Sequence, residues 1–276
     1  MEFEIKDGLK IGGGNLVVIA GPCMAESLDI CLETAERMKA ICSKLELEYV
    51  FKASFDKANR SAADSFRGPG LEKGLEMLAK VAERFNLPTL TDIHLPEQAE
   101  RVAEVADILQ IPAFLCRQTD LLVAAGETGK AINVKKGQFM SPREMSGALE
   151  KVKSTGNDKV LLTERGTFFG YNNLVVDMRS LVEMRALGAP VVFDATHSVQ
   201  TPGGLGKSSG GRREFVRPLA RAASAVGIDA LFLEAHPNPD NAKSDGPNSV
   251  DFKLAETILE EAAAIAMLQK KRGHAY

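Results

Sequence analysis

The chain has 276 residues, 45% of them hydrophobic, and its 34 lysines and arginines nearly balance its 37 aspartates and glutamates, giving a formal net charge of -3. Without a long basic run or basic residues interleaved with aromatic ones, this balance gives no reason to expect nucleic acid as a partner. Residues 1–6 lack the features of a signal peptide, and no apolar run is long enough to span a bilayer. We therefore expect a cytoplasmic protein with no membrane partner.

The four cysteines, Cys23, Cys31, Cys42 and Cys116, show no zinc-ribbon spacing. Disulfides are rare in a reducing compartment, so we expect all four to be free thiols. Three of them are expected to be small buried hydrophobic residues. Cys23 differs because it follows the first predicted strand.

Short apolar runs typical of buried strands recur eight times along the chain, at residues 16–20, 49–52, 89–93, 107–111, 131–134, 160–163, 191–193 and 230–233. Amphipathic stretches typical of helices lie between them, for example at residues 28–45, 71–85, 96–105 and 142–153. Apolar strands flanked by helices indicate a parallel sheet, and eight such units favour a closed barrel over an open doubly wound sheet. We predict an α/β fold with one (β/α)8 TIM barrel domain over residues 1–276.

Residues 1–14 precede the first barrel strand and are expected to form a short N-terminal β-hairpin that plugs the bottom of the barrel. Its strands are predicted at Phe3–Ile5 and Leu9–Ile11. The run Gly12–Gly14 comes before the first strand and not after it, so it is a turn and not a dinucleotide-binding loop.

Polar residues gather at the predicted carboxyl ends of the strands. In barrels of this kind these ends meet at one rim, where the chemistry takes place. The residues concerned are Cys23, Lys52, Asp92, His94, Gln110, Lys135, Lys136, Glu164, Arg165, Asp194, His197, Glu234 and His236. Two loops on the same rim, 200–213 and 237–249, are long and polar and are candidate active-site loops.

The segment from Lys52 to Ser61 has the composition of a phosphate-binding site, with two lysines, an arginine, an amide and hydroxyls. A solvated basic loop is the alternative, but such a loop has no need of a lysine on the last strand residue. Two anion sites would explain the number of cations on the rim. One would consist of Lys57, Lys135 and Arg165, and the other of Arg60 and Ser61.

A second constellation has the composition of a metal site. Cys23, His197, Glu234 and Asp245 supply a thiol, an imidazole and two carboxylates on or after strands one, seven and eight, which are neighbours if the barrel closes. This mixed donor set suits a divalent ion such as zinc, iron, manganese or cobalt. A lone histidine is more often structural, and His94 and His236 remain open between a supporting and a structural role.

Several segments together resemble one known enzyme family: KASFDKANRS at 52–61, QIPAFLCRQTD at 110–120, NVKKGQF at 133–139, TERG at 163–166, FGYNNL at 169–174 and DATHSVQ at 194–200. They are similar to the 3-deoxy-D-manno-octulosonate 8-phosphate synthases, and the resemblance covers nearly the whole chain. It implies condensation of phosphoenolpyruvate with D-arabinose 5-phosphate and water in lipopolysaccharide (KDO) biosynthesis. Cys23 resembles the metal-dependent members, whose metal-independent counterparts have asparagine there.

The resemblance also implies roles for individual residues and an assembly. It places Lys52, Lys57, Gln110, Lys135 and Arg165 at phosphoenolpyruvate, and Asn59, Arg60, Ser61 and Asp92 at arabinose 5-phosphate. It implies that Lys57, Asp92, Lys135 and His197 act in catalysis. A homotetramer in which Arg117 reaches a neighbouring subunit's site is implied as well.

Three other functions stay open from the residues. A 3-deoxy-D-arabino-heptulosonate 7-phosphate synthase shares the barrel and metal site, but its loop typically has Lys-Pro-Arg-Thr where this chain has residues 57–61. A Schiff-base aldolase would use Lys52, Lys57 or Lys135 as a nucleophile. A non-catalytic barrel that binds phosphosugars would use the same anion sites without turnover.

Overall fold

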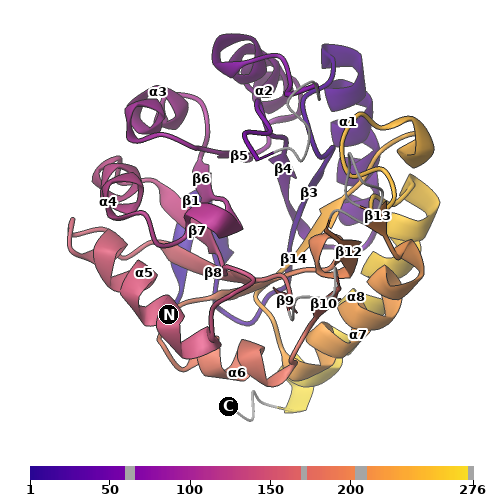
Figure 1. Ribbon diagram of the computed structural model, residues 1–276. Helices are drawn as coiled ribbons and strands as arrows, with labels where there is room; N and C mark the ends of the chain where they lie inside the picture. The colour runs from indigo at the N-terminus through magenta and orange to yellow at the C-terminus, as the bar shows by residue number, and fades with distance from the viewer. Residues whose placement is uncertain (60–65, 169–172, 203–209, 273–276) are drawn as a thin grey trace.

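Eight parallel strands close into a barrel in the computed structural model (Figure 1), which describes residues 1–59, 66–168, 173–202 and 210–272. The barrel strands are β3 (Val17–Gly21), β4 (Glu48–Lys52), β5 (Thr89–Asp92), β6 (Ile108–Ile111), β7 (Ala131–Lys135), β8 (Val160–Glu164), β11 (Val191–Asp194) and β14 (Ala230–Glu234). Each predicted apolar run is one of these strands, and the predicted (β/α)8 barrel is confirmed.

The barrel closes where its first and last strands pair. β14 lies beside β3 in parallel register, with Ala230 opposite Val17 and Glu234 opposite Gly21. Position 21, at the end of β3, is a glycine because a Cβ atom there would lie 1.9 Å from the backbone oxygen of Lys52. Residues after the first, seventh and eighth barrel strands therefore lie next to one another on the rim, as the sequence predicted.

Helices form the outer layer around the strands in Figure 1. They are α1 (Leu28–Lys44), α2 (Leu71–Phe85), α3 (Ala99–Ala103), α4 (Thr119–Glu127), α5 (Met145–Lys153), α6 (Arg179–Arg185), α7 (Val216–Val226) and α8 (Phe252–Arg272). Ser27 caps α1 by accepting a hydrogen bond from the Ile30 N–H. The helices predicted at 96–105 and 142–153 begin instead as 3₁₀ turns, η1 (Pro96–Gln98) and η3 (Pro142–Glu144).

The N-terminal hairpin closes the amino end of the barrel. It consists of β1 (Phe3–Lys6) and β2 (Leu9–Ile11), and its turn residues Asp7 and Gly8 have φ of 49° and 85°, as a tight hairpin turn requires. Leu9 and Ile11 are buried in one apolar cluster with Val17 and other barrel residues. The predicted plug is confirmed.

The interior has two apolar layers, one inside the barrel and a larger one between the strands and the helices. All four cysteines are free and buried, and burial raises the pKa of Cys31 and of Cys42 to about 12. Among the helices in the described ranges, none combines the length and the apolar character needed to cross a bilayer.

Candidate active site at the carboxyl end of the barrel

The predicted metal-type residues come together on the rim. The donor atoms of Cys23, Glu234 and Asp245 all lie within 4.8 Å of one another. His197 Nε2 lies 3.3 Å from Glu234 Oε1 and 3.8 Å from Asp245 Oδ2. We call Cys23, His197, Glu234 and Asp245 the Cys23 group. The structure thus juxtaposes residues from both ends of the chain.

Each member of the Cys23 group is held by its local backbone. Cys23 follows β3 and Glu234 ends β14, while His197 begins the 3₁₀ turn η4 (His197–Val199) after β11. Asp245 lies in the loop after β14 with a φ of 49°, and its backbone oxygen accepts hydrogen bonds from the N–H groups of residues 248 and 249. This local turn directs the Asp245 carboxylate toward Cys23, whose sulfur lies 3.2 Å from Oδ2.

The donor set fits a divalent cation. Glu234 Oε2 is buried and has no hydrogen-bond partner in the described part of the chain. Burial opposes the charge of Glu234, but His197, Lys52 and Lys57 outweigh it and lower its pKa to about 2, so the carboxylate is ionised. Burial and the nearby Glu234 raise the pKa of the Cys23 thiol well above its usual value. A cation bound here would be a partner for Glu234 Oε2 and would favour the thiolate form of Cys23.

Buried cations form the other half of the site. Lys52 is 1% exposed and donates to the Cys23 backbone oxygen and to Glu234 Oε1, both at 2.9 Å. Lys135 Nζ lies 2.6 Å from Asp194 Oδ2 and 4.0 Å from the centre of the Phe232 ring. Burial lowers the pKa of Lys135 even though Asp194 opposes this effect.

Arg165 carries a spare donor. Its Nη2 donates to Gln200 Oε1 at 2.6 Å, whereas Nη1 is buried without a partner among the described residues. Burial lowers the pKa of this guanidinium. A buried donor without an acceptor is unfavourable unless a ligand completes it, so Nη1 is suited to an anion.

A second buried pair fixes the backbone of Arg165. Glu164 Oε1 accepts the N–H groups of Arg165 and Gly166 at 3.0 and 2.6 Å, and Oε2 accepts from the Ser180 hydroxyl at 2.6 Å. Lys136 Nζ lies 3.6 Å from Glu164 Oε1. This carboxylate therefore determines where the chain leaves β8 and where the Arg165 side chain begins.

A row of polar side chains crosses β5, β6, β7 and β8 inside the barrel. Gln110 donates to Asp92 and accepts from Asn133 at 2.9 Å, and Asn133 accepts from Thr163 at 2.6 Å. Lys57 Nζ lies 3.9 Å from Asp92. Burial would raise the pKa of Asp92, but Lys57 and Lys52 outweigh it and hold that pKa far below its usual value. Asp92 is thus a charged acceptor beside a lysine.

Comparison with known proteins places the chain in a family. Residues 2–269 match the model of the DAHP synthetase I family. The chain belongs to this family. Three relatives named 2-dehydro-3-deoxyphosphooctonate aldolase come from Fusobacterium nucleatum, a Cyanothece species and Desulfatibacillum aliphaticivorans. They are 56%, 58% and 58% identical, over 97%, 96% and 95% of this chain and 97% of each relative.

The remaining predicted site residues lie outside the cluster just described or contact other parts of the chain. Asn59 and Arg117 are exposed, and Arg60 and Ser61 lie outside the described residues, as does part of the predicted loop 200–213. His94 packs edge-on against Phe55, with ring centres 5.7 Å apart. His236 Nδ1 accepts the N–H of residue 238 at 3.0 Å, and its Nε2 lies 3.8 Å from Glu26 Oε1.

Sequence reasoning missed the supporting residues Asn133, Ser180 and Gln200, and it named Glu164 as a rim residue without its partners. Asn133 and Gln200 stand in the segments that carried the family resemblance, but only the fold shows which partners their amides meet. Ser180 lies in α6 and not at a strand end, and its bond to Glu164 joins residues 16 positions apart. No pattern in one sequence identifies such contacts.

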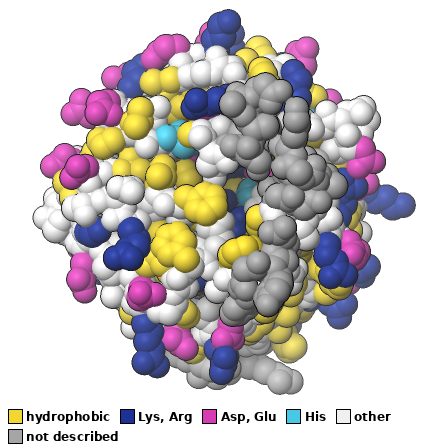
Figure 2. All heavy atoms as spheres, in the orientation of Figure 1, with side chains coloured by type: hydrophobic (Ala, Val, Ile, Leu, Met, Phe, Trp, Pro, Cys, Tyr) yellow, Lys and Arg dark blue, Asp and Glu magenta, His cyan; other side chains and the backbone are white. Residues whose placement is uncertain are grey.

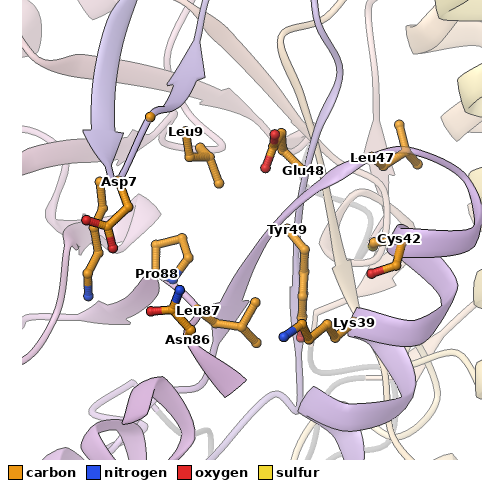
Figure 3. Close-up of a pocket in the computed structure, with 13 residues that line it drawn as sticks. Asp7, Leu9, Lys39, Cys42, Leu47, Glu48, Tyr49, Asn86, Leu87 and Pro88 are labelled. Carbon is orange, nitrogen blue, oxygen red and sulfur yellow. The ribbon is translucent and has the colours of Figure 1, made fainter. Parts of the chain in front are cut away.

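A pocket of about 340 Å³ lies at the other end of this DAHP synthetase I family barrel (Figure 3). It is lined by the hairpin turn at Asp7, the end of α1, the start of β4 and the residues just before β5. Lys39, one of its lining residues, donates to the Phe85 backbone oxygen at 2.7 Å. The pocket includes none of the residues predicted to act on substrates, so the candidate site is the carboxyl-end rim.

Proposed function

We propose that the chain condenses phosphoenolpyruvate with D-arabinose 5-phosphate and water to give 3-deoxy-D-manno-octulosonate 8-phosphate and inorganic phosphate, a reaction of lipopolysaccharide (KDO) biosynthesis. The observation that carries this proposal is the identity of 56–58% over at least 95% of the chain with relatives named for that product. The buried cations and the Cys23 group at one rim support it.

The two substrates would occupy neighbouring parts of the rim. We assign phosphoenolpyruvate to Lys57, Gln110, Lys135 and Arg165, with Lys52 beside them, because Arg165 Nη1 is an unsatisfied buried donor among these groups. We assign the arabinose phosphate to Asn59, Arg60, Ser61 and Asp92. The ionised Asp92 carboxylate would accept hydrogen bonds from sugar hydroxyls.

The chemistry joins two anions that repel each other. The enol carbon of phosphoenolpyruvate attacks the aldehyde carbon of the sugar, positive charge develops at the adjacent carbon, water adds there, and phosphate leaves by cleavage of its C–O bond. The cations would hold both anions in reacting position and stabilise the departing phosphate, which is a large part of the expected rate. We propose that Lys57, Asp92, Lys135 and His197 contact the reacting groups.

A divalent ion is proposed as the cofactor of the Cys23 group. Bound there, zinc, iron, manganese or cobalt would polarise an oxygen of the aldehyde or lower the pKa of a water molecule. The spare buried oxygen of Glu234 supports this assignment. Chelation followed by dialysis should abolish turnover, and added manganese should restore it. Full activity in protein that elemental analysis shows to be free of metal would exclude this role.

The choice of sugar phosphate tests the proposed function. Purified protein should release phosphate from phosphoenolpyruvate with arabinose 5-phosphate and should show a larger kcat/KM for it than for erythrose 4-phosphate. A larger kcat/KM for erythrose 4-phosphate would assign the chain to the seven-carbon reaction instead. Binding of both substrates without phosphate release would indicate a non-catalytic barrel.

One observation favours a Schiff-base aldolase as the second candidate. Burial lowers the pKa of Lys135, which would favour a neutral amine. The bond to Asp194 at 2.6 Å instead favours the ammonium. Borohydride added with pyruvate should therefore leave the mass of the protein unchanged, whereas a covalent adduct on Lys135 would support the aldolase.

A homotetramer in the cytoplasm is proposed as the working form. Leu95, Phe114, Phe139 and Phe168 are exposed large hydrophobic residues that follow or flank the carboxyl ends of neighbouring strands. Hydrophobic side chains are visible on this face in Figure 2. Covering them with a second copy would bring Arg117 toward a neighbour's site. Light scattering should give four times the chain mass of 29.7 kDa.

A further inference from the structure

One amide side chain joins the cationic half of the site to the Cys23 group. Gln200 begins β12 (Gln200–Thr201), a short strand on the rim, and is half-buried. Its Oε1 accepts from Arg165 Nη2 at 2.6 Å, and its Nε2 donates to Asp245 Oδ1 at 3.0 Å. Arg165 and Asp245 lie 80 positions apart in the chain, yet a single side chain connects them.

The chemistry of the two partners requires a carboxamide. A guanidinium only donates and a carboxylate only accepts, so the orientation of the Gln200 amide is fixed by its neighbours. Glutamate at this position would face Asp245 with a second negative charge and no donor. Leucine would be shorter and would have neither polar atom. Glutamine is the side chain of this length that satisfies both partners.

Gln200 leaves a polar atom of each partner available. Nη2 of Arg165 is occupied, whereas its buried Nη1 has no partner among the described residues and can donate to an anion. Because Oδ1 of Asp245 is occupied, Oδ2 is the oxygen that faces Cys23 Sγ, at 3.2 Å, and His197 Nε2, at 3.8 Å. Asp245 is therefore set to offer a single oxygen to the Cys23 group.

We propose that Gln200 is a positioning residue that couples anion binding at Arg165 to divalent cation binding at Asp245. This inference rests on the proposed function, which places phosphoenolpyruvate at Arg165 and a cation in the Cys23 group. Either ligand immobilises the partner that it binds, and the two hydrogen bonds of Gln200 transmit this restriction to the other partner. The second ligand then has less ordering left to do and binds more tightly, and by linkage the effect is reciprocal.

A second contact with the same loop supplies a matched control. Arg213 Nη2 donates to the Gly246 backbone oxygen at 2.6 Å and to Asp240 Oδ1 at 3.0 Å. It holds the Asp245 loop without contacting Arg165. An Arg213→Met variant therefore loosens the loop but leaves the amide link intact.

The test is calorimetric titration of phosphoenolpyruvate into chelated protein and into protein saturated with Mn²⁺. In the wild type and in Arg213→Met, Mn²⁺ should increase the phosphoenolpyruvate affinity by about 5-fold or more, the lower end of usual coupling between sites. In Gln200→Leu and Gln200→Glu the ratio should fall to about 1, the value for independent sites. Thermal melts on the same samples show that each variant is folded.

An unchanged ratio in both folded Gln200 variants, or a ratio of about 1 in the wild type, would overturn the inference. Turnover assays on the same preparations separate this result from the proposed function. Normal condensation by wild-type protein without Gln200-dependent coupling overturns the coupling alone. Gln200-dependent coupling in protein that does not condense the two substrates supports the coupling and rejects the reaction. Wild-type protein that does not bind phosphoenolpyruvate rejects both.

Discussion

The two ends of the barrel interior have opposite compositions. At the amino end the hairpin residues Leu9 and Ile11 pack with apolar barrel residues such as Val50 and Leu90. At the carboxyl end the buried groups are charged, and they include Lys52, Lys135, Arg165, Asp194 and Glu234. The Phe232 ring marks the boundary, since it belongs to the apolar cluster and lies 4.0 Å from Lys135 Nζ. Stability is thus expected to come mainly from one end and chemistry from the other.

The charged end opposes folding unless its groups are paired. Taking an ion out of water is unfavourable, and only good partners offset that penalty. Lys52 and Lys135 each have a carboxylate partner, at 2.9 and 2.6 Å. Within the described ranges, the Arg165 side chain is bonded to an amide and to no carboxylate, and its Nη1 has no partner. Variants at the two ends of the barrel should therefore separate activity from stability.

The largest expected effect is on activity at the charged end. Arg165→Met removes a buried cation that has no bonded carboxylate among the described residues, so the melting temperature should stay the same or rise. The variant should lose about 100- to 1,000-fold in kcat/KM for phosphoenolpyruvate, as when an aligned transition-state donor is removed. Steady-state kinetics and thermal melts on one preparation measure both. Parallel losses of activity and stability would contradict the separation of the two ends.

The next effect is on stability at the apolar end. Ile11 is 0% exposed, so Ile11→Ala should lower the free energy of unfolding by about 2 to 5 kcal/mol through lost burial and the cavity it leaves. The kcat of the folded fraction should be unchanged, because Ile11 lies at the end opposite the site. Denaturant unfolding and kinetics at low temperature test this. Met267→Ala, which alters an exposed side chain of α8, is the control and should change stability little.

The smallest effect is a change in the pH dependence of stability. The pKa of Asp92 is lowered on folding by Lys57 and Lys52 against the effect of burial. The stability that this charge contributes is therefore fully present above its unfolded pKa of about 3.9 and is lost as the pH falls below that value. Uptake of one proton on unfolding changes the free energy of unfolding by about 1.4 kcal/mol per pH unit. In Asp92→Asn, the free energy of unfolding should fall less steeply below about pH 4, by up to this amount per pH unit. Urea titrations at several pH values measure the two slopes. Identical slopes would mean that Asp92 has the same pKa in both states.

The fold was predictable because its signal is local and repeated. Barrel strands such as β3 and β8 have apolar side chains on both faces, so the runs predicted at 16–20 and 160–163 are visible without knowledge of their neighbours. The predicted helix at 71–85 is confirmed at both ends. The Cys23 group was predictable from its donor side chains and from strand order, since barrel closure places the first strand beside the last.

The supporting contacts were not predictable, because they depend on side-chain geometry between distant segments. Gln200 and Glu164 look like ordinary polar residues in one sequence, yet each orients Arg165 in a different way. The 3₁₀ starts at Pro96 and Pro142 were also missed, since an amphipathic pattern does not distinguish the first turn of a helix from a 3₁₀ turn.

Closure of the barrel between β3 and β14 also bears on how the molecule is assembled during folding. The contact between Cys23 and Asp245 joins residues 222 positions apart, so nearly the whole chain must be made before the group exists. Contacts of such long sequence separation form slowly. If the group binds its cation, the ion recognises the finished barrel and not its parts, and added metal should slow unfolding more than it speeds folding.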